Sequence, residues 1–311
     1  MAHHTYLTVF THPSCFDHDT GPRHPECSER LHAVLKALRA EAIIDYRDAP
    51  RATIEQVTRV HPQHYIDTLL DMIPEHGWVF VDSDTVISPG SGHAAFHAAG
   101  SLCAAVDHVM TEPADTRAFC AIRPPGHHAL PDQAMGFCLF NNIAIGAKHA
   151  RDVHKVRRIA IIDFDVHHGN GTQAIFEDDA DVLYVSTHQY PLFPGTGAAF
   201  ERGRHENVMN IPLPAMSGST LFREQVTTVI IPKLLEFDAD LIMISAGFDG
   251  HTNDPLATLN LIEDDYAWVT NRLVEIAQQC CQGRVISTLE GGYNLTALAS
   301  SCAIHVKALM I

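Results

Sequence analysis

The hydrophobic positions of the chain follow two patterns that alternate along its length. Short apolar runs predict strands over residues 5–10, 117–122, 159–162, 181–187, 240–245 and 284–289. Between them, apolar residues at three- and four-residue spacing predict a helix capped by Ser28, a helix beginning at Ser91, and helices over 141–154, 219–237 and 266–276. We interpret this order as an α/β fold, a parallel sheet with helices on both faces.

Polar side chains appear directly after the run at 159–162. That run is β-branched and has no polar position, which is typical of a strand buried on both faces. Asp163, Asp165 and His167 follow at alternate positions, so an extended backbone would direct them to one side. Buried carboxylates need a cation or hydrogen-bond donors beside them, and these residue types suit zinc. The alternative is an ordinary strand exit whose acids face solvent.

Further polar residues follow the other predicted strands. His127 and His128 stand after a Pro-Pro-Gly turn, Asp254 follows the run at 240–245, and Tyr293 follows the run at 284–289. Because ligands of parallel sheets bind beyond the carboxyl ends of the strands, we expect these residues to meet at one edge. Taken singly, each is also compatible with an ordinary packed or turn residue.

A catalytic zinc site needs three protein ligands and one open position. Asp165, His167 and Asp254 would supply oxygen and nitrogen ligands and leave room for water or substrate. Such a metal polarises a carbonyl and makes a bound water more acidic. The predicted chemistry is therefore hydrolytic.

Amide hydrolysis also needs a base, an acid and an oxyanion donor. His127 and His128 can divide the proton transfers, with Asp163 and Asn170 as the partners that orient their rings. Tyr293, on a glycine-flanked loop, has the hydroxyl that a tetrahedral oxyanion requires.

Composition narrows the class of protein. The chain has 311 residues, 46% of them hydrophobic, and no linker, so we expect one domain over residues 1–311. Its formal net charge of −16 argues against direct nucleic acid binding. We see neither a signal peptide nor a membrane span, and predict a cytoplasmic protein. The eight cysteines lack the spacing of a thiolate zinc site and are expected to be reduced.

Several of these residues belong to motifs of a known family. The chain resembles the zinc-dependent histone deacetylases, including bacterial deacetylases and acetoin-utilisation-type proteins. The resemblance begins near the His24–Pro25–Glu26 loop and is carried by Arg-Pro-Pro-Gly-His-His-Ala at 123–129, Gly-Phe-Cys at 136–138, Asp-Phe-Asp-Val-His-His-Gly-Asn-Gly at 163–171, Pro-Gly-Thr-Gly at 194–197, Asp-Pro at 254–255 and Glu-Gly-Gly-Tyr-Asn at 290–294.

The resemblance implies the three-layer arginase-deacetylase fold with an eight-stranded parallel sheet. It implies zinc, with ferrous iron as the alternative metal, on the three ligands named above. It also implies His128 as general base, Asp163 paired with His127, and Asn170 paired with His128. The residues matching the acyl-lysine channel are Phe137 and Phe193, flanked by Gly136 and Leu256.

The same resemblance implies cations and contacts outside the catalytic centre. A structural potassium ion is expected between the side chains of Asp163 and Ser186 and the backbone carbonyls of Asp165, His167 and Thr187. A second cation site is suggested near Phe176, Asp179 and Val182. Arg30 matches a basic residue near the acetate exit, and Asp84 a contact to substrate backbone at the rim.

Differences from the family motifs define the subgroup. Asn170 stands where class I members carry Asp, which indicates a class II-like protein. Leu256 stands where polyamine-selective relatives carry Glu, which argues against acetylpolyamines as the substrate. Asn253 replaces a usual Gly, and we attach no consequence to it.

We therefore expect a hydrolase acting on acyl-lysine in proteins or peptides, alone or as a homo-oligomer. The nearest alternative is a deacetylase of acetylpolyamines or another small acetylated amine. A binuclear manganese ureohydrolase would need bridging carboxylates where Phe164 and Val166 stand. A protein that binds acyl-lysine without cleaving it is the alternative from another class.

Overall fold

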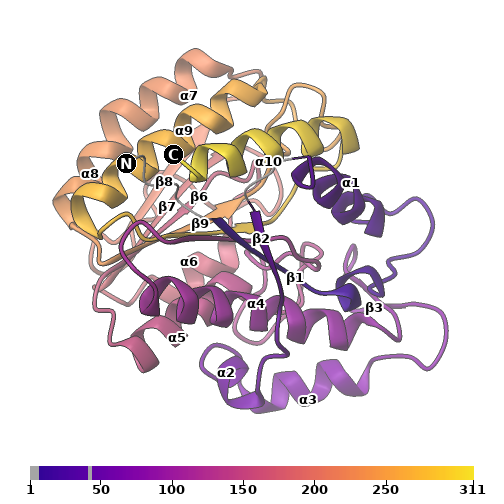
Figure 1. Ribbon diagram of the computed structural model, residues 1–311. Coiled ribbons are helices and arrows are strands. Elements are labelled where there is room, and N and C mark those ends of the chain that lie inside the picture. The colour runs from indigo at the N-terminus through magenta and orange to yellow at the C-terminus, as the bar shows by residue number, and fades with distance from the viewer. Residues whose placement is uncertain (1–6, 41–43) are drawn as a thin grey trace.

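One eight-stranded parallel sheet forms the framework of the computed structural model, which describes residues 7–40 and 44–311 (Figure 1). The strand order is β2-β1-β5-β10-β9-β6-β7-β8. The strands are β1 Leu7–Thr11, β2 Ile44–Asp48, β5 Arg117–Cys120, β6 Ile159–Asp163, β7 Val182–Gln189, β8 Val208–Leu213, β9 Leu241–Ala246 and β10 Val285–Leu289. A separate antiparallel hairpin pairs β3 Val79–Phe80 with β4 Val86–Ile87.

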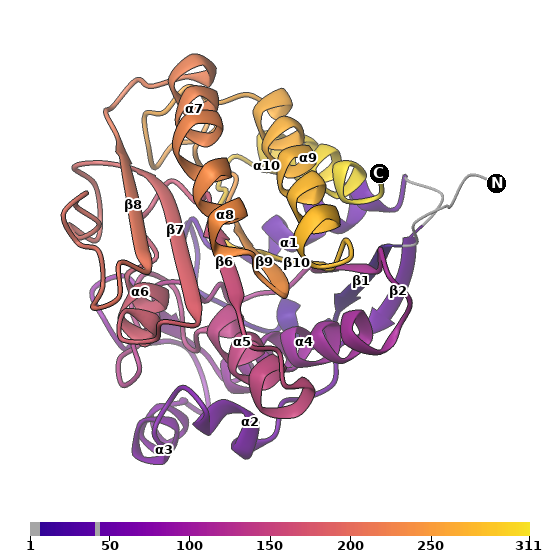
Figure 2. The same cartoon turned by 90° about the vertical axis from the view of Figure 1, so that its left-hand side faces the viewer.

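Helices cover both faces of the sheet (Figure 2). One layer contains α4 Ser91–Thr111, α5 Asn142–His154 and α6 Asn170–Phe176, with the short helices α2 Ile54–Thr58 and α3 Gln63–Asp71 outside it. The other layer contains α1 Ser28–Leu38, α7 Ser219–Gln225, α8 Ile231–Phe237, α9 Glu263–Cys280 and α10 Leu295–Leu309. A π-helical segment, Val226–Ile230, joins α7 to α8, and a 3-10 turn, Pro13–Phe16, follows β1.

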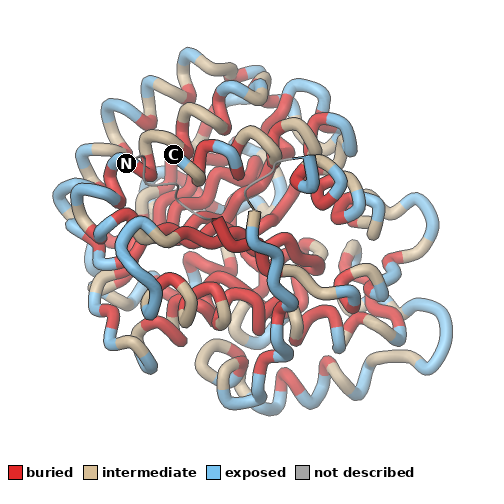
Figure 3. The backbone as a smooth tube through the Cα atoms, viewed as in Figure 1, coloured by how far each residue is buried: buried red, intermediate tan, exposed pale blue. Residues whose placement is uncertain are grey.

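The core lies between these layers, where the central strands are buried from end to end (Figure 3). Every residue of β6, β7, β9 and β10 is buried. A strand covered by helices on both faces cannot alternate polar and apolar positions, which explains the continuous apolar runs in the sequence.

The predicted fold is confirmed, with local differences. The predicted helix over 219–237 is present as α7, the π segment and α8. Ser28 is not the helix cap, because α1 begins at that residue and Cys27 stands at the N-cap position. Residues 5 and 6 of the first predicted strand lie outside the described residues.

The pattern did not predict the two edge strands or α10. β2 is largely exposed and polar, so its sequence carries no periodic signal. β8 contains Pro212, which has no N–H and is tolerated at a sheet edge. α10 is apolar over most of its length, so its hydrophobic positions form no clear stripe.

A buried histidine fixes the start of α5. Nδ1 of His61 lies 2.9 Å from the carbonyl oxygen of Pro131, and its Nε2 accepts the backbone N–H of Asn141 at 2.8 Å. These partners require the neutral ring, and burial lowers the pKa of His61 to about 4. Asn141, the N-cap of α5, is held in place by this contact.

Candidate active site

The predicted site residues meet at the carboxyl ends of four adjacent central strands. β5, β10, β9 and β6 are neighbours in the sheet although they are distant in sequence. His127 and His128 follow β5, Asp165 and His167 follow β6, and Tyr293 follows β10. The strand order therefore brings these residues together at one edge of the sheet, as their positions after the strands led us to expect.

His127 is held as a cation by two carboxylates. Its Nδ1 lies 3.0 Å from Oδ2 of Asp163, and its Nε2 lies 3.8 Å from Oδ1 of Asp165. Burial alone would lower the pKa of His127, but the two carboxylates outweigh it and raise the pKa to about 10. Glu290 fixes the backbone here, because its Oε2 accepts the N–H groups of Gly126 and His127 at 2.7 and 3.2 Å.

His128 has the opposite character. Its Nδ1 lies 2.8 Å from Oδ1 of Asn170, an acceptor, so the ring proton sits on Nδ1 and Nε2 is free to accept. Burial and the neighbouring imidazoles of His127 and His167 lower its pKa well below the ordinary value. Gly136, at φ +56°, packs against this ring, and a Cβ there would stand 2.5 Å from Cδ2 of His128.

Three metal-ligand atoms converge beside these histidines. Atoms of Asp165, His167 and Asp249 lie within 4.8 Å of one another, and all three residues are buried. Nδ1 of His167 lies 3.2 Å from Oδ1 of Asp165 and 3.1 Å from Oδ2 of Asp249. The structure therefore adds Asp249, which the motif analysis did not single out.

Asp254, the third predicted ligand, follows in the same loop as Asp249. Its Oδ2 accepts the backbone N–H groups of Tyr293 and Asn294 at 2.7 and 3.2 Å, and its Oδ1 accepts that of Leu256 at 3.0 Å. These contacts tie the loop after β9 to the Tyr293 loop. Its role as a ligand remains a prediction.

The electrostatics of this cluster fit a bound cation. Burial and the charge of Asp165 raise the pKa of Asp249 to about 7. For His167, burial opposes protonation, but Asp165 and Asp249 raise its pKa to about 10. Buried carboxylates and an imidazole whose oxygen and nitrogen atoms converge are the environment of a divalent metal. The donors present therefore fit zinc or ferrous iron.

Tyr293 closes the other side of the site. Burial raises the pKa of its hydroxyl well above the ordinary value, so the group remains a proton donor. Its ring lies 5.8 Å from that of Phe137, and the guanidinium carbon of Arg30 lies 4.8 Å from its centre. Phe193 stands against the histidines, 5.1 Å from the ring of His128. Two aromatic walls therefore flank the site.

The predicted cation sites outside the catalytic centre remain predictions. Asp163 and Ser186 are register partners in β6 and β7, as a potassium site between them would need. At the second predicted site, one side-chain amide contacts the backbone of the three named residues. Nδ2 of Asn207 donates to the backbone oxygens of Phe176, Asp179 and Val182 at 2.8, 3.1 and 3.0 Å.

A second group of metal-type donors joins α4 to α5. Oδ1 of Asp107 lies 2.8 Å from Nε2 of His149 and 2.7 Å from Nε2 of His154. Arg59 donates to Nδ1 of His149 at 2.9 Å, so the proton of that ring sits on Nε2 and points at Asp107. We interpret this group as a hydrogen-bonded tie between the helices.

A buried ion-pair network supports the site, and the motif analysis did not find it. Glu26, Arg30 and Arg123 are all 0% exposed. Nη2 of Arg123 donates to Oε2 of Glu26 at 2.7 Å, and Nη1 of Arg30 donates to its Oε1 at 3.0 Å. Nε of Arg30 also donates to the carbonyl oxygen of Gly292 at 2.6 Å. The network thereby holds the Tyr293 loop. The sequence motifs included Glu26, Arg30 and Arg123, but nothing in them indicated that the three side chains pair.

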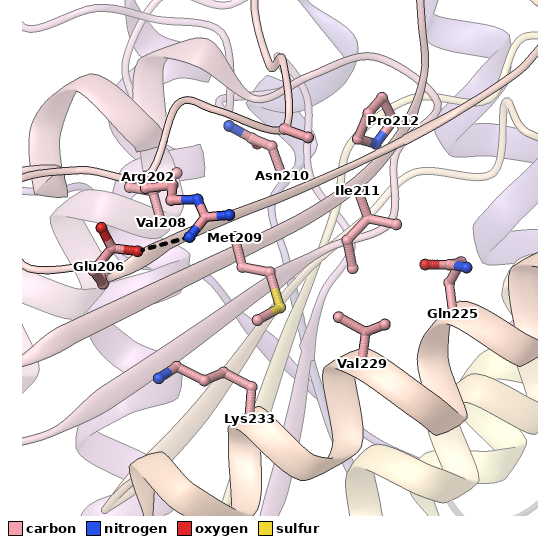
Figure 4. A pocket seen from close by; sticks show the side chains of 11 residues that line it. Arg202, Glu206, Val208, Met209, Asn210, Ile211, Pro212, Gln225, Val229 and Lys233 are labelled. Atoms are coloured by element: carbon pink, nitrogen blue, oxygen red, sulfur yellow. Dashed lines mark hydrogen bonds and ion pairs between the residues drawn. The ribbon is translucent and has the colours of Figure 1, made fainter.

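A cavity of about 430 Å³ lies apart from this site, between β8 and the helical segment from α7 to α8 (Figure 4). Met209, Ile211 and Val229 point into it, with Arg202 and Glu206 paired at one end at 3.3 Å. None of its lining residues is a predicted site residue.

Comparisons with known proteins define the family. Residues 24–309 match the model of the histone deacetylase domain. The chain is 39% identical to the "histone deacetylase-like amidohydrolase" of Pseudomonas aeruginosa over 91% of this chain and 74% of that protein. It is 38% identical to the chloroplastic "histone deacetylase 14" of Arabidopsis thaliana over 92% of this chain and 73% of that protein.

Structural similarity agrees with these matches. The crystal structure of the HDA15 HD domain superimposes with a TM-score of 0.90 at 31% identity, over 98% of this chain and 88% of that one. The protein belongs to the histone deacetylase family and has the arginase-deacetylase fold. It is a hydrolase of the deacetylase type. Within residues 7–40 and 44–311, no helix is both long and apolar enough to cross a membrane.

Proposed function

We propose that this protein removes acyl groups from lysine side chains of proteins or peptides, with zinc as its metal. The observation that carries the proposal is the pair of adjacent buried imidazoles with different hydrogen-bond partners. Nδ1 of His127 lies 3.0 Å from the carboxylate of Asp163, which raises the pKa of that ring, whereas Nδ1 of His128 lies 2.8 Å from the amide oxygen of Asn170, which leaves Nε2 of His128 as an acceptor. Both lie beside the Asp165–His167 centre, so a base and a positive charge are available together.

Zinc on Asp165, His167 and Asp254 would polarise the acyl carbonyl and lower the pKa of a water molecule. Nε2 of His128 takes a proton from the attacking water as the new C–O bond forms. The same proton then passes to the leaving amine nitrogen as the C–N bond breaks, giving a carboxylic acid and free lysine. The hydroxyl of Tyr293 donates a hydrogen bond to the oxyanion, and the charge of His127 stabilises it.

Channel and cation assignments complete the proposal. Phe137 and Phe193 would contact the methylenes of the lysine stem with their flat apolar faces. Leu256, half-buried beside Asp254, contributes no charge that would attract a second amine. We assign a structural potassium ion to the predicted site at Asp163 and Ser186.

The test is hydrolysis of a fluorogenic acetyl-lysine peptide by zinc-loaded protein, with acetylspermidine as a competing substrate. Tyr293→Phe should lower kcat about 100-fold or more, because one oxyanion donor is lost. Tyr46→Phe is the matched control, since Tyr46 is partly exposed on the edge strand β2. Preferred cleavage of acetylspermidine would refute the substrate assignment, and tight peptide binding without turnover would refute the reaction.

A further inference from the structure

We propose that a groove beside the β3–β4 hairpin binds an apolar or aromatic side chain next to the acyl-lysine of a peptide substrate. The inference rests on the proposed function and deepens it, because it assigns the substrate to peptides or proteins with such a neighbour. We call this feature the hairpin groove. One wall is the loop at residues 20–25, and the other is formed by Trp78, Phe80 and Val86.

Exposed aromatic surface is the first reason to assign a ligand to the groove. Trp78 is 49% exposed and Phe80 is 67% exposed. Large aromatic side chains grouped around a hollow leave water in contact with apolar surface, and binding sites are the common reason. The wall is already formed, because the indole ring of Trp78 lies beside the backbone at Gly21, where a Cβ would stand in ordinary van der Waals contact with the ring at 3.5 Å.

The hairpin groove adjoins Phe137, the residue that we assign to the acyl-lysine channel. His24 lines the groove, and its ring lies 4.8 Å from that of Phe137 in an edge-on arrangement. The hairpin is tied to the same wall, since Oγ1 of Thr85 accepts the backbone N–H of Phe137 at 3.0 Å. Nε2 of His24 also donates to the carbonyl oxygen of Asp84 at 3.0 Å. A side chain in the groove would therefore belong to a residue close to the acyl-lysine.

Size and charge select the occupant. The groove holds about 290 Å³, just below the range of drug-sized ligand pockets and suited to one large side chain. Among its described lining residues, Arg23 carries the one permanent charge. Within the described residues, the lining has no carboxylate to pair with a lysine or arginine, whereas a phenylalanine, tyrosine or leucine would bury apolar area against Trp78 and Phe80.

The test compares acetyl-lysine peptides that carry phenylalanine, glycine or lysine on either side of the modified residue. Binding is measured by fluorescence anisotropy on zinc-loaded Tyr293→Phe protein, and hydrolysis is measured on the unmodified chain. Phenylalanine should improve both Kd and kcat/KM about tenfold over glycine on one side, a factor expected for partial burial of an aromatic ring. Trp78→Ala and Phe80→Ala should remove most of this preference.

Leu235→Ala is the matched control, because Leu235 is a 42% exposed apolar residue on α8. The Leu235→Ala variant should prefer the phenylalanine peptide over the glycine peptide as strongly as the unmodified chain does. Equal or undetectable binding of the phenylalanine and glycine peptides, or a preference that survives both aromatic substitutions, overturns the groove assignment. A preference in binding that depends on Trp78 and Phe80, with no hydrolysis of any peptide, supports the groove and refutes the proposed reaction.

Discussion

Glu26→Gln should destabilise the protein by about 3 kcal/mol, because it leaves two buried guanidinium groups without their shared carboxylate. Glu26, Arg30 and Arg123 are inaccessible to solvent, so water cannot replace the lost charge. Burial alone would raise the pKa of Glu26, but Arg123 and Arg30 outweigh it and lower the pKa to about 2. Relative to the ordinary value of 4.5, that difference corresponds to about 3 kcal/mol in favour of the charged form.

The assay is equilibrium unfolding in urea at pH 7, with Glu29→Gln as the control. Glu29 is an exposed carboxylate in the first turn of α1, so its substitution should change the free energy of unfolding by less than about 0.5 kcal/mol. Arg123→Met completes a double-mutant cycle. The double variant should lose clearly less than the sum of the single losses, because the second substitution removes a charge that the first left unpaired.

The sign of the pH dependence provides a second check on the same residue. A carboxyl group whose pKa is lowered by folding stabilises the protein above its unfolded pKa. That stabilisation is lost as the pH falls from about 4.5 towards about 2. Glu26→Gln should flatten the stability profile in this range. A loss below about 0.5 kcal/mol at pH 7, or additive single losses in the cycle, would refute the reasoning.

Three further predictions concern other parts of the molecule. His61 is neutral in the folded protein, with its pKa lowered from 6.5 to about 4, so protonation favours the unfolded chain. Between pH 7 and 5 this residue should lower the free energy of unfolding of the unmodified chain by about 2 kcal/mol. His61→Gln keeps a donor and an acceptor but does not titrate, so an equal loss for this variant in urea unfolding would contradict the assignment. Gly136→Ala should lower kcat about 100-fold through displacement of His128 while leaving the fold intact by circular dichroism. Gly77→Ala is the control for backbone strain, because Gly77 also has a positive φ, +72°, but open space around it. If both variants lose kcat equally, contact with His128 does not explain the loss in Gly136→Ala. Asp165→Asn should lower zinc affinity at least tenfold in metal titrations, whereas Asp107→Asn should leave it unchanged, and the reverse result would move the metal to the α4–α5 tie.

The sequence alone determined the central strands and their chemistry. β6 is apolar from Ile159 to Ile162, as is typical of a strand buried on both faces, so the polar residues Asp163, Asp165 and His167 stand out at its end. The pairings of His127 with Asp163 and of His128 with Asn170 were expected, and the structure places them at 3.0 and 2.8 Å. Each of these residues stands in a motif at a strand exit, and the family resemblance supplied the pairing between the two exits.

Only the tertiary structure decided which residues complete the site. Asp249 joins the metal-type donors because β9 lies next to β6 in the sheet, an adjacency that sequence order does not specify. Glu26 reaches Arg123 across 97 positions of sequence, and no periodic pattern records such a pair. The hairpin groove likewise forms where residues 20–25 meet β3 and β4. Such contacts depend on packing between distant segments, whereas strand and helix patterns report only the face that each element buries.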